Sequence, residues 1–251
     1  MNINRAAIKL NAKNQMRAAK PHVCLVALVY YVIAWILTYL SERIMGLDAF
    51  RRVMYAAQDL DSLYYYAAPA VTFWGSLISL AISIVSATLT VGFTIYALHI
   101  SRLQPAGVGT LFDGFAIFFR ALWLNILMGI FIFLWSLLFV IPGIIAAYRY
   151  RQAMYLLLDN PQMSALDCIR ESKRMMVGRK WELFVLDLSF LGWDLLCIVP
   201  FVSIWVMPYT EVTYANYYQA LLGLPNGGGR PYNSGDTGRP DSSDGKPPWE
   251  L

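Results

Sequence analysis

The sequence contains several long apolar stretches that carry almost no charge. The longest, Val71 to Ile100, has no Asp, Glu, Lys or Arg. A run of 18 or more apolar residues is a transmembrane-helix candidate, because about 20 helical residues cross about 30 Å of hydrocarbon. Charged residues make up only 14% of the chain, against roughly 25% in an average soluble domain. The sequence therefore predicts an all-α, polytopic transmembrane helical bundle.

The first 20 residues form a separate basic, amphipathic segment. They hold five cations and no acid: Arg5, Lys9, Lys13, Arg17 and Lys20. The first four recur every four residues, which places them in one stripe on a helix. Two interpretations are open: a surface helix that attracts anionic lipid headgroups, or a solvated tail that only fixes topology. Both place the N-terminus on the cytoplasmic side.

Residues 21–222 are expected to form the transmembrane domain, and 223–251, rich in Gly, Pro, Ser and Asp, a disordered tail. The expected six spans are 21–40, 71–100, 115–140, 144–158, 183–199 and 209–222. The fourth is short and follows a hinge expected at Pro142-Gly143. Because it carries Arg149 and Arg151, a re-entrant or interfacial segment is the alternative. The last span contains Glu211, and the bundle has five spans if that segment does not cross.

Two surface helices are expected beside these spans. A short outer helix is predicted at 49–58, between the first two spans. An amphipathic cytoplasmic helix is predicted to begin after the N-cap Ser164, with Asp167 three residues later, and to end at Gly178. The basic stretch from Arg170 to Lys180 belongs inside by the positive-inside rule. With residues 1–20 also inside, the number of crossings is even and the C-terminus lies inside.

The second span carries a stripe of small residues. It consists of Gly75, Ser79, Ser83, Ser86 and Thr90, and continues to Thr94. Steps of three and four residues place these side chains on one helix face, where they allow another helix to approach closely. A polar substrate path uses the same residue types, but the stripe has no charge or amide. Helix packing is therefore the favoured interpretation.

Ionisable residues in the expected spans form a candidate polar cluster. Its members are Arg149, Arg151, Asp187, Asp194 and Glu211. Intramembrane charges are costly and suggest a functional site with a partner. Here the natural partners are each other, with either arginine pairing with Asp187. The alternative is that these charges lie near the interface, snorkel or pair, and fix helix register.

Signals for catalysis, cofactors or metals are missing. The sequence has no H-E-x-x-H, G-x-S-x-G or Walker-type motif. Cys24, Cys168 and Cys197 lack the spacing of a zinc site or disulfide framework and are expected to pack as small apolar residues. No charge run resembles a nucleic-acid-binding arm. The sequence therefore predicts no enzyme, no cofactor, no bound metal and no nucleic-acid partner.

Several strings between Ile141 and Gln219 resemble a bacterial family of integral membrane proteins, the domain-of-unknown-function family 975. They are Ile141 to Ile145 (IPGII), Tyr155 to Pro161 (YLLLDNP), Ser172 to Phe184 (SKRMMVGRKWELF), Leu188 to Trp193 (LSFLGW), Pro208-Tyr209 and Tyr217-Tyr218. The resemblance covers about residues 1–222. It implies a multi-pass protein of the bacterial cytoplasmic membrane and supplies no catalytic residue.

Two functional classes follow from these features. The first is a non-catalytic membrane module that binds or regulates a membrane-protein or peptide partner, with its basic segments on anionic headgroups. The second is a small transporter or pore that uses the intramembrane arginines and aspartates. The first is favoured, because the two halves of the chain show no inverted repeat with matched broken helices. The sequence does not determine the oligomeric state.

Overall fold

The computed structural model describes residues 4–44, 73–197 and 200–223, and no strand forms within these ranges. The helices are α1 (Arg5–Ala18), α2 (Val23–Ile44), α5 (Phe73–Ser101), the 3-10 helix η1 (Val108–Ile117), α6 (Phe118–Leu138), α7 (Val140–Tyr150), α8 (Ala153–Asp159), α9 (Ala165–Met175), α10 (Lys180–Leu188), α11 (Leu191–Leu196) and α12 (Pro200–Leu221). The all-helical fold class is therefore confirmed for the described residues. The helix expected at 49–58 and the tail from residue 224 lie outside them.

Three segments are long and apolar enough to cross a membrane: Val23–Ile44, Phe73–Ser101 and Val108–Leu138. The first two match the expected first and second spans, and the third joins η1 to α6. Their outer surfaces expose large apolar side chains, including Trp35, Trp74 and Trp123. Such exposure in water would be unfavourable, whereas lipid solvates these side chains. These features indicate a membrane protein.

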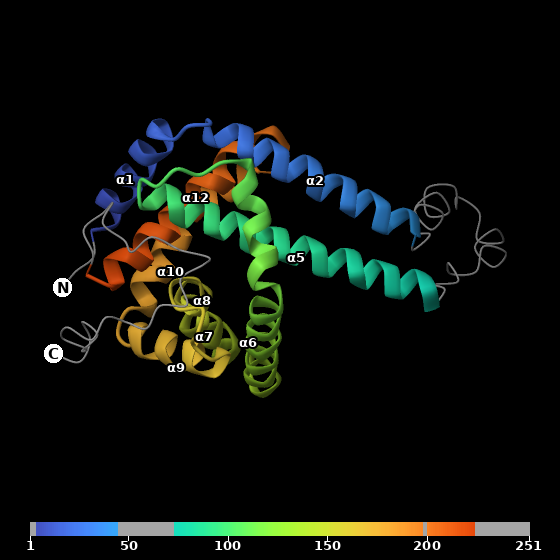
Figure 1. The fold of residues 1–251 in the computed structure, drawn as a ribbon. Helices are drawn as coiled ribbons and strands as arrows, with labels where there is room; N and C mark the ends of the chain where they lie inside the picture. Colours follow the sequence, from blue (N-terminus) through green and yellow to red (C-terminus); the bar gives the residue numbers. More distant parts are fainter. Residues whose placement is uncertain (1–3, 45–72, 198–199, 224–251) are drawn as a thin grey trace, which may run out of the picture.

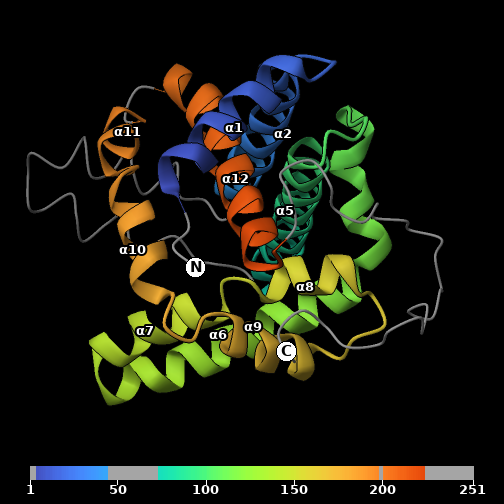
Figure 2. The same ribbon diagram turned by 90° about the vertical axis from the view of Figure 1, so that its left-hand side faces the viewer.

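The long helices form two projecting pairs. Helices α2 and α5 run side by side, and α6 pairs with α7 in a hairpin that runs crosswise to α5 (Figures 1 and 2). Helix α12 packs against α1, α2 and the C-terminal half of α5. Helix α8 packs against α9. The buried core therefore lies where the two pairs meet, and the distal parts of both pairs project from it.

The closest approach between these segments joins α5 to η1. A Cβ atom added to Gly92 would overlap the carbonyl oxygen of Leu111 and lie 2.6 Å from its carbonyl carbon. A Cβ atom on Gly114 would lie 2.5 Å from the carbonyl oxygen of Thr88. The two glycines thus let two backbones touch, which larger residues would prevent.

The turn between α6 and α7 lies three residues earlier than expected. Phe139 is extended (φ −160°, ψ 150°) and separates the two helices. The expected hinge residues, Pro142 and Gly143, instead lie inside α7. Proline is tolerated there because a helix's first N–H groups have no intrahelical acceptor. Gly143 lets α7 approach Ser136 of α6, whose Cα atom would lie 2.9 Å from an added Cβ.

The last two expected spans differ from the helices found. Residues 183–199 do not form one helix, because the chain breaks at Ser189 between α10 and α11. Conversely, α12 is continuous through Pro208, so it is longer than the expected span 209–222. Helix α12 carries Glu211 and several other polar groups, and it is not among the three segments apolar enough to cross by composition.

Each of the two predicted surface helices buries one of its faces inside the protein. In α1, Ile8, Ala12 and Met16 are buried, and this helix packs on α12 and α5. In α9, the expected N-cap holds: Ser164 Oγ accepts from the Asp167 amide, and Gly178 has a positive φ of 73°. The buried α9 residues face α6, α7 and α8. Other helices thus cover the apolar face of α9 and one face of α1, while Leu10 of α1 stays 59% exposed.

Candidate functional site

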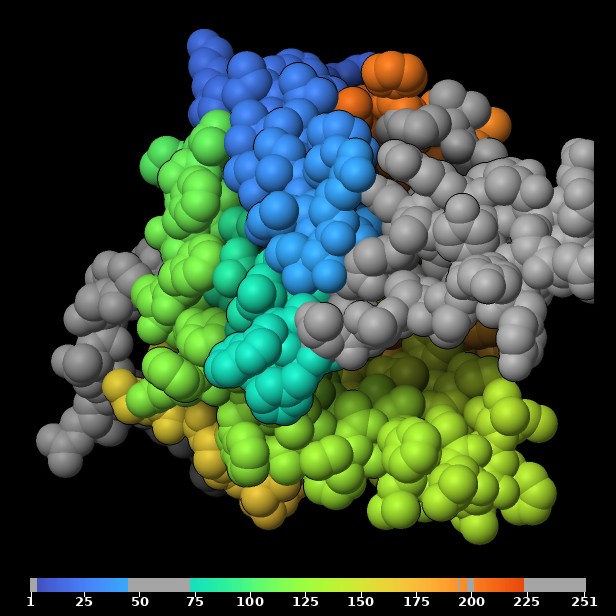
Figure 3. Space-filling view, turned by 90° about the vertical axis from the view of Figure 1, so that its right-hand side faces the viewer, coloured from blue at the N-terminus to red at the C-terminus, as the bar shows by residue number. Residues whose placement is uncertain are grey.

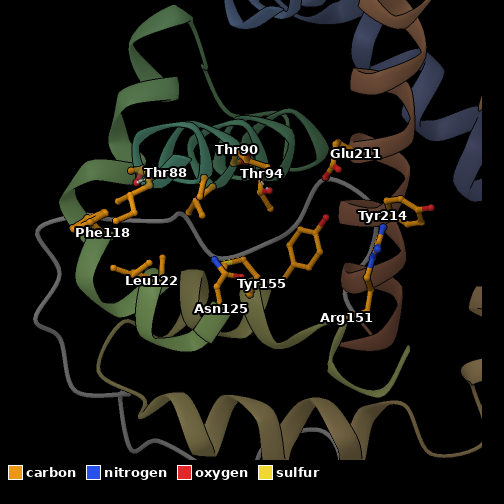
Figure 4. Close-up of a pocket in the computed structure, with 15 residues that line it drawn as sticks. Thr88, Thr90, Thr94, Phe118, Leu122, Asn125, Arg151, Tyr155, Glu211 and Tyr214 are labelled. Carbon is orange, nitrogen blue, oxygen red and sulfur yellow. Dashed lines mark hydrogen bonds between the residues drawn. The ribbon is translucent and has the colours of Figure 1, made fainter. Parts of the chain in front are cut away.

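A cavity of about 480 Å³ lies between α5, α6, α8 and α12 (Figure 4). Its size is typical of small-ligand pockets. One end is apolar, with Phe118 and Leu122 of α6 beside Ile84 and Ala87 of α5. Thr90 and Thr94 of α5 and Asn125 of α6 line the middle. The opposite end carries charged side chains. We call this space the graded cavity, because its lining changes from apolar at one end to charged at the other.

The charged end is formed by Arg151, Glu211, Tyr155 and Tyr214. The guanidinium carbon of Arg151 lies 4.6 Å from the centroid of the Tyr214 ring, an arrangement that attracts the cation to the ring face. Arg151 also interacts electrostatically with Glu211 and Asp187. Arg151 is exposed and lines the cavity, so a ligand in the cavity could reach it.

Asp187 is held behind this end by two phenols. Tyr214 donates to one carboxylate oxygen at 2.6 Å, and Tyr148 donates to the other at 2.9 Å. These bonds join α10 to α12 and α7. Because Tyr214 contacts both groups, it links the Arg151 cation to the Asp187 carboxylate.

The structure thus brings together three of the five residues of the predicted polar cluster: Arg151, Asp187 and Glu211. The ion pairs among the described residues are Arg102–Asp159, Arg170–Asp167 and Arg174–Glu171. The expected direct pair of an arginine with Asp187 is replaced by the two tyrosines. Arg149 does not line the cavity, and its carbonyl accepts from Ser172 Oγ at 2.7 Å. Asp194 belongs to α11, and its side chain lies outside the described part of the structure.

The small-residue stripe on α5 lies toward α2. Ser83 and Ser86 line a groove with Thr38, Ser41 and Glu42 of α2. The Thr90 hydroxyl is 3.1 Å from the Tyr30 hydroxyl of α2. Gly75 and Ser79 are buried, whereas Ser83 and Thr90 remain exposed. The close backbone contact of α5 is made instead through Gly92, which is not part of the stripe.

Sequence reasoning missed a buried ion pair at the C-terminal end of α5. An Arg102 terminal nitrogen (Nη2) lies 2.7 Å from both oxygens of Asp159, and the Arg102 side chain is 0% exposed. Tyr218 donates to Asp159 at 2.8 Å. Asp159 ends α8 and Tyr218 belongs to α12, so one carboxylate ties three helices together. The available signal was that Asp159 and Tyr218 both fall in strings that carry the family resemblance.

A second missed feature is a chain of buried amides beside this pair. Asn216 donates to Gln15 at 2.7 Å, and Gln15 donates to the Ser101 carbonyl at 2.9 Å. Gln219 donates to the Ser101 hydroxyl at 2.5 Å. These bonds fix α1 and α12 on the end of α5. Buried polar groups of this kind need such partners.

The three cysteines are free thiols in the structure. Burial raises the pKa of the Cys168 thiol to about 11, which reduces its reactivity because the thiolate is the nucleophile. Among the described residues, no group of three or more His, Cys, Asp or Glu side chains is arranged to hold a metal ion.

Comparisons with known proteins place the chain in a family. No curated protein and no solved structure matches it significantly. Residues 1–146 and 137–224 match the family described as protein of unknown function (DUF975). The two matches together span α1 to α12. The chain therefore belongs to the DUF975 family.

Proposed function

We propose that the protein is a non-catalytic membrane module, and that its cavity holds an amphipathic part of a membrane partner or peptide. The graded cavity carries this proposal. Phe118 and Leu122 offer an apolar wall, and Arg151 and Glu211 offer opposite charges at the other end. Ligand sites commonly combine an apolar lining with a few polar groups that fix orientation.

The charged end suits a polar group that both accepts and donates hydrogen bonds. Arg151 supplies donors only, whereas an ionised Glu211 supplies acceptors. Behind them, Tyr148 and Tyr214 both donate to Asp187, and the Tyr214 ring lies 4.6 Å from the Arg151 guanidinium carbon, which favours this position of the cation. Glu211 is half-buried and the neighbouring Tyr155 is buried, so a polar group bound beside them would be partly shielded from water, which strengthens its hydrogen bonds.

Photo-crosslinking from the cavity wall tests this proposal. With a photo-reactive amino acid at Leu122, we expect one dominant polypeptide adduct in native membranes, identified by mass spectrometry. The same amino acid at Phe133, which is 68% exposed on α6 outside the cavity, is the control and should give only lipid adducts. Arg151→Ala should reduce the Leu122 adduct, whereas Arg149→Ala should not.

Other outcomes of this experiment are informative. Lipid adducts alone at Leu122 would mean that the cavity holds lipid and would contradict a protein or peptide partner. Equal adducts from Leu122 and Phe133 would contradict a specific site. Equal yields of the Leu122 adduct in the Arg151→Ala and Arg149→Ala variants would show that the charged end of the cavity does not contribute to binding.

The transporter or pore hypothesis is supported by one observation: Arg151 and Glu211 border open space between helices. Charged residues of this kind mark ion and substrate pathways in membrane proteins. Glu211→Gln would then abolish ion flux in proteoliposomes while leaving the helical content unchanged. Absence of flux for the unchanged protein would remove this second candidate.

We further propose a multi-pass orientation in the bacterial cytoplasmic membrane. Residues 1–20 and 170–180 are expected inside, against anionic headgroups, so the number of crossings is even and the C-terminus is inside. Six crossings, as expected from the sequence, satisfy this rule, and so does a smaller even number. Reporter fusions at Asn11, Leu60, Ser172 and Gly235 should read in, out, in and in. An outside signal at Ser172 or Gly235 would contradict this orientation.

A further inference from the structure

The turn that connects α6 to α7 is apolar and exposed. Leu137, Leu138, Phe139, Val140 and Ile141 are 73%, 62%, 69%, 70% and 70% exposed. This tip projects from the body of the molecule (Figure 3). No charged residue occurs between Arg120 and Arg149. A turn that emerged from the far side of a membrane would place these side chains in water.

The length of α7 argues against a full crossing. Its 11 residues span roughly 16 Å, about half of the hydrocarbon thickness of about 30 Å. After α7 the chain turns at Arg151 and Gln152 into α8, whose Leu156 to Leu158 are buried within the protein. Even if α7 lay along the membrane normal, it would therefore reach only about halfway through the bilayer.

The direction of the hairpin supports the same conclusion. Helix α6 runs crosswise to α5 in both ribbon views (Figures 1 and 2). Two crosswise helices do not both lie along the membrane normal. Helix α5 has 29 residues and pairs with α2, so the α2–α5 pair is the better candidate for the full crossing.

Interfacial side chains gather at the base of the hairpin. The Tyr148 ring of α7 lies 6.0 Å from the Phe184 ring of α10, which in turn stacks 5.1 Å from Trp181. Trp181 is 72% exposed and follows Lys180. Tryptophan and basic residues are typical of the headgroup region on the cytoplasmic side. The base of the hairpin thus has the composition of an interface, and its tip has that of the bilayer interior.

We propose that the α6–α7 hairpin is re-entrant: it enters the leaflet on the side of residues 170–180 and returns to that side. Its tip, Leu137 to Ile141, contacts the acyl chains in the interior of the bilayer. The number of crossings stays even, because the hairpin removes two expected crossings together. This inference is independent of what occupies the cavity.

Single-cysteine labelling in membrane vesicles tests this inference. The three native cysteines are replaced, and Phe139→Cys or Ile141→Cys is introduced at the tip. Val177→Cys, 72% exposed beside the basic segment, is the inside control. A membrane-impermeant maleimide should label residue 177 from the inside only and residues 139 and 141 from neither side. All three should react after denaturation in detergent.

A depth measurement completes the test. An environment-sensitive fluorophore at residue 139 should be quenched most strongly by lipids brominated near the chain end, and the same fluorophore at residue 177 by headgroup quenchers. Labelling of residue 139 or 141 from the outside would show a full crossing and overturn the proposal. Labelling from the inside with headgroup-level quenching would place the hairpin on the surface and also overturn it.

Discussion

Replacing Asp159 with alanine is expected to lower the free energy of unfolding by about 3–5 kcal/mol. The Arg102 side chain is 0% exposed and binds both Asp159 oxygens at 2.7 Å. Without the carboxylate, the buried Arg102 guanidinium loses this ion pair, and removing one member of a buried pair costs more than the loss of a neutral hydrogen bond. The variant also removes the acceptor of the Tyr218 hydroxyl. Because the carboxylate joins α5, α8 and α12, the loss should appear in global unfolding.

Reversible unfolding in mixed detergent, followed by circular dichroism, measures this effect. Arg170→Ala is the matched control, because its pair with Asp167 is 73% and 46% exposed. Exposed pairs contribute about 0–1 kcal/mol. Tyr218→Phe, which removes one hydrogen bond, should cost about 1 kcal/mol. Similar losses for Asp159→Ala and Arg170→Ala would show that the buried pair does not stabilise the fold.

Replacing both partners at once tests whether Arg102 and Asp159 stabilise the fold as a pair. Asp159→Leu combined with Arg102→Met removes the buried cation and its counter-ion together. The double variant should therefore be more stable than Asp159→Leu alone, since apolar replacements of buried pairs are often tolerated. Additive losses would indicate that the two residues act independently.

The apolar pattern was enough to predict helices but not all of their ends. Long charge-free runs were enough to predict α2 and α5, because an apolar segment that crosses a membrane must satisfy its backbone hydrogen bonds internally, as a helix does. The α6–α7 turn was misplaced because Pro142-Gly143 is a strong breaker signal. At the start of a helix, however, proline costs little, and the extended Phe139 carries no such signal.

The sequence allowed the charged residues of the site to be predicted, but not the contacts that they make. Arg151, Asp187 and Glu211 attracted attention because charges are rare in apolar segments. Their partners were not predictable, since Tyr148 and Tyr214 are 39 and 27 residues from Asp187. The Arg102–Asp159 pair was missed for the same reason, as 57 residues separate its members. Such contacts depend on how the helices pack, which periodicity does not specify.

Gly92 makes a close backbone contact that the small-residue stripe on α5 did not include. The stripe was chosen by counting small residues at helical spacing, and it lies toward α2. The backbone contact with η1 instead needs a single position without a Cβ, because the Leu111 carbonyl occupies that space. Spacing rules find faces rich in small residues, but they do not find one required glycine.

Gly92→Ala is therefore expected to destabilise the protein by about 1–3 kcal/mol or more, because the added Cβ would overlap backbone atoms that no side-chain rotation can move. Gly129→Ala in α6 is the matched control, since nothing lies within 4 Å of its added Cβ. There the same substitution should be neutral or stabilise by up to about 1 kcal/mol, because alanine favours the helix over glycine. Only the Gly92→Ala variant should therefore lose stability, which thermal unfolding in detergent measures directly. A Gly92→Ala variant as stable as Gly129→Ala would mean that η1 does not pack on α5 at this distance, and the cavity bounded by α5 and α6 would then have a different shape.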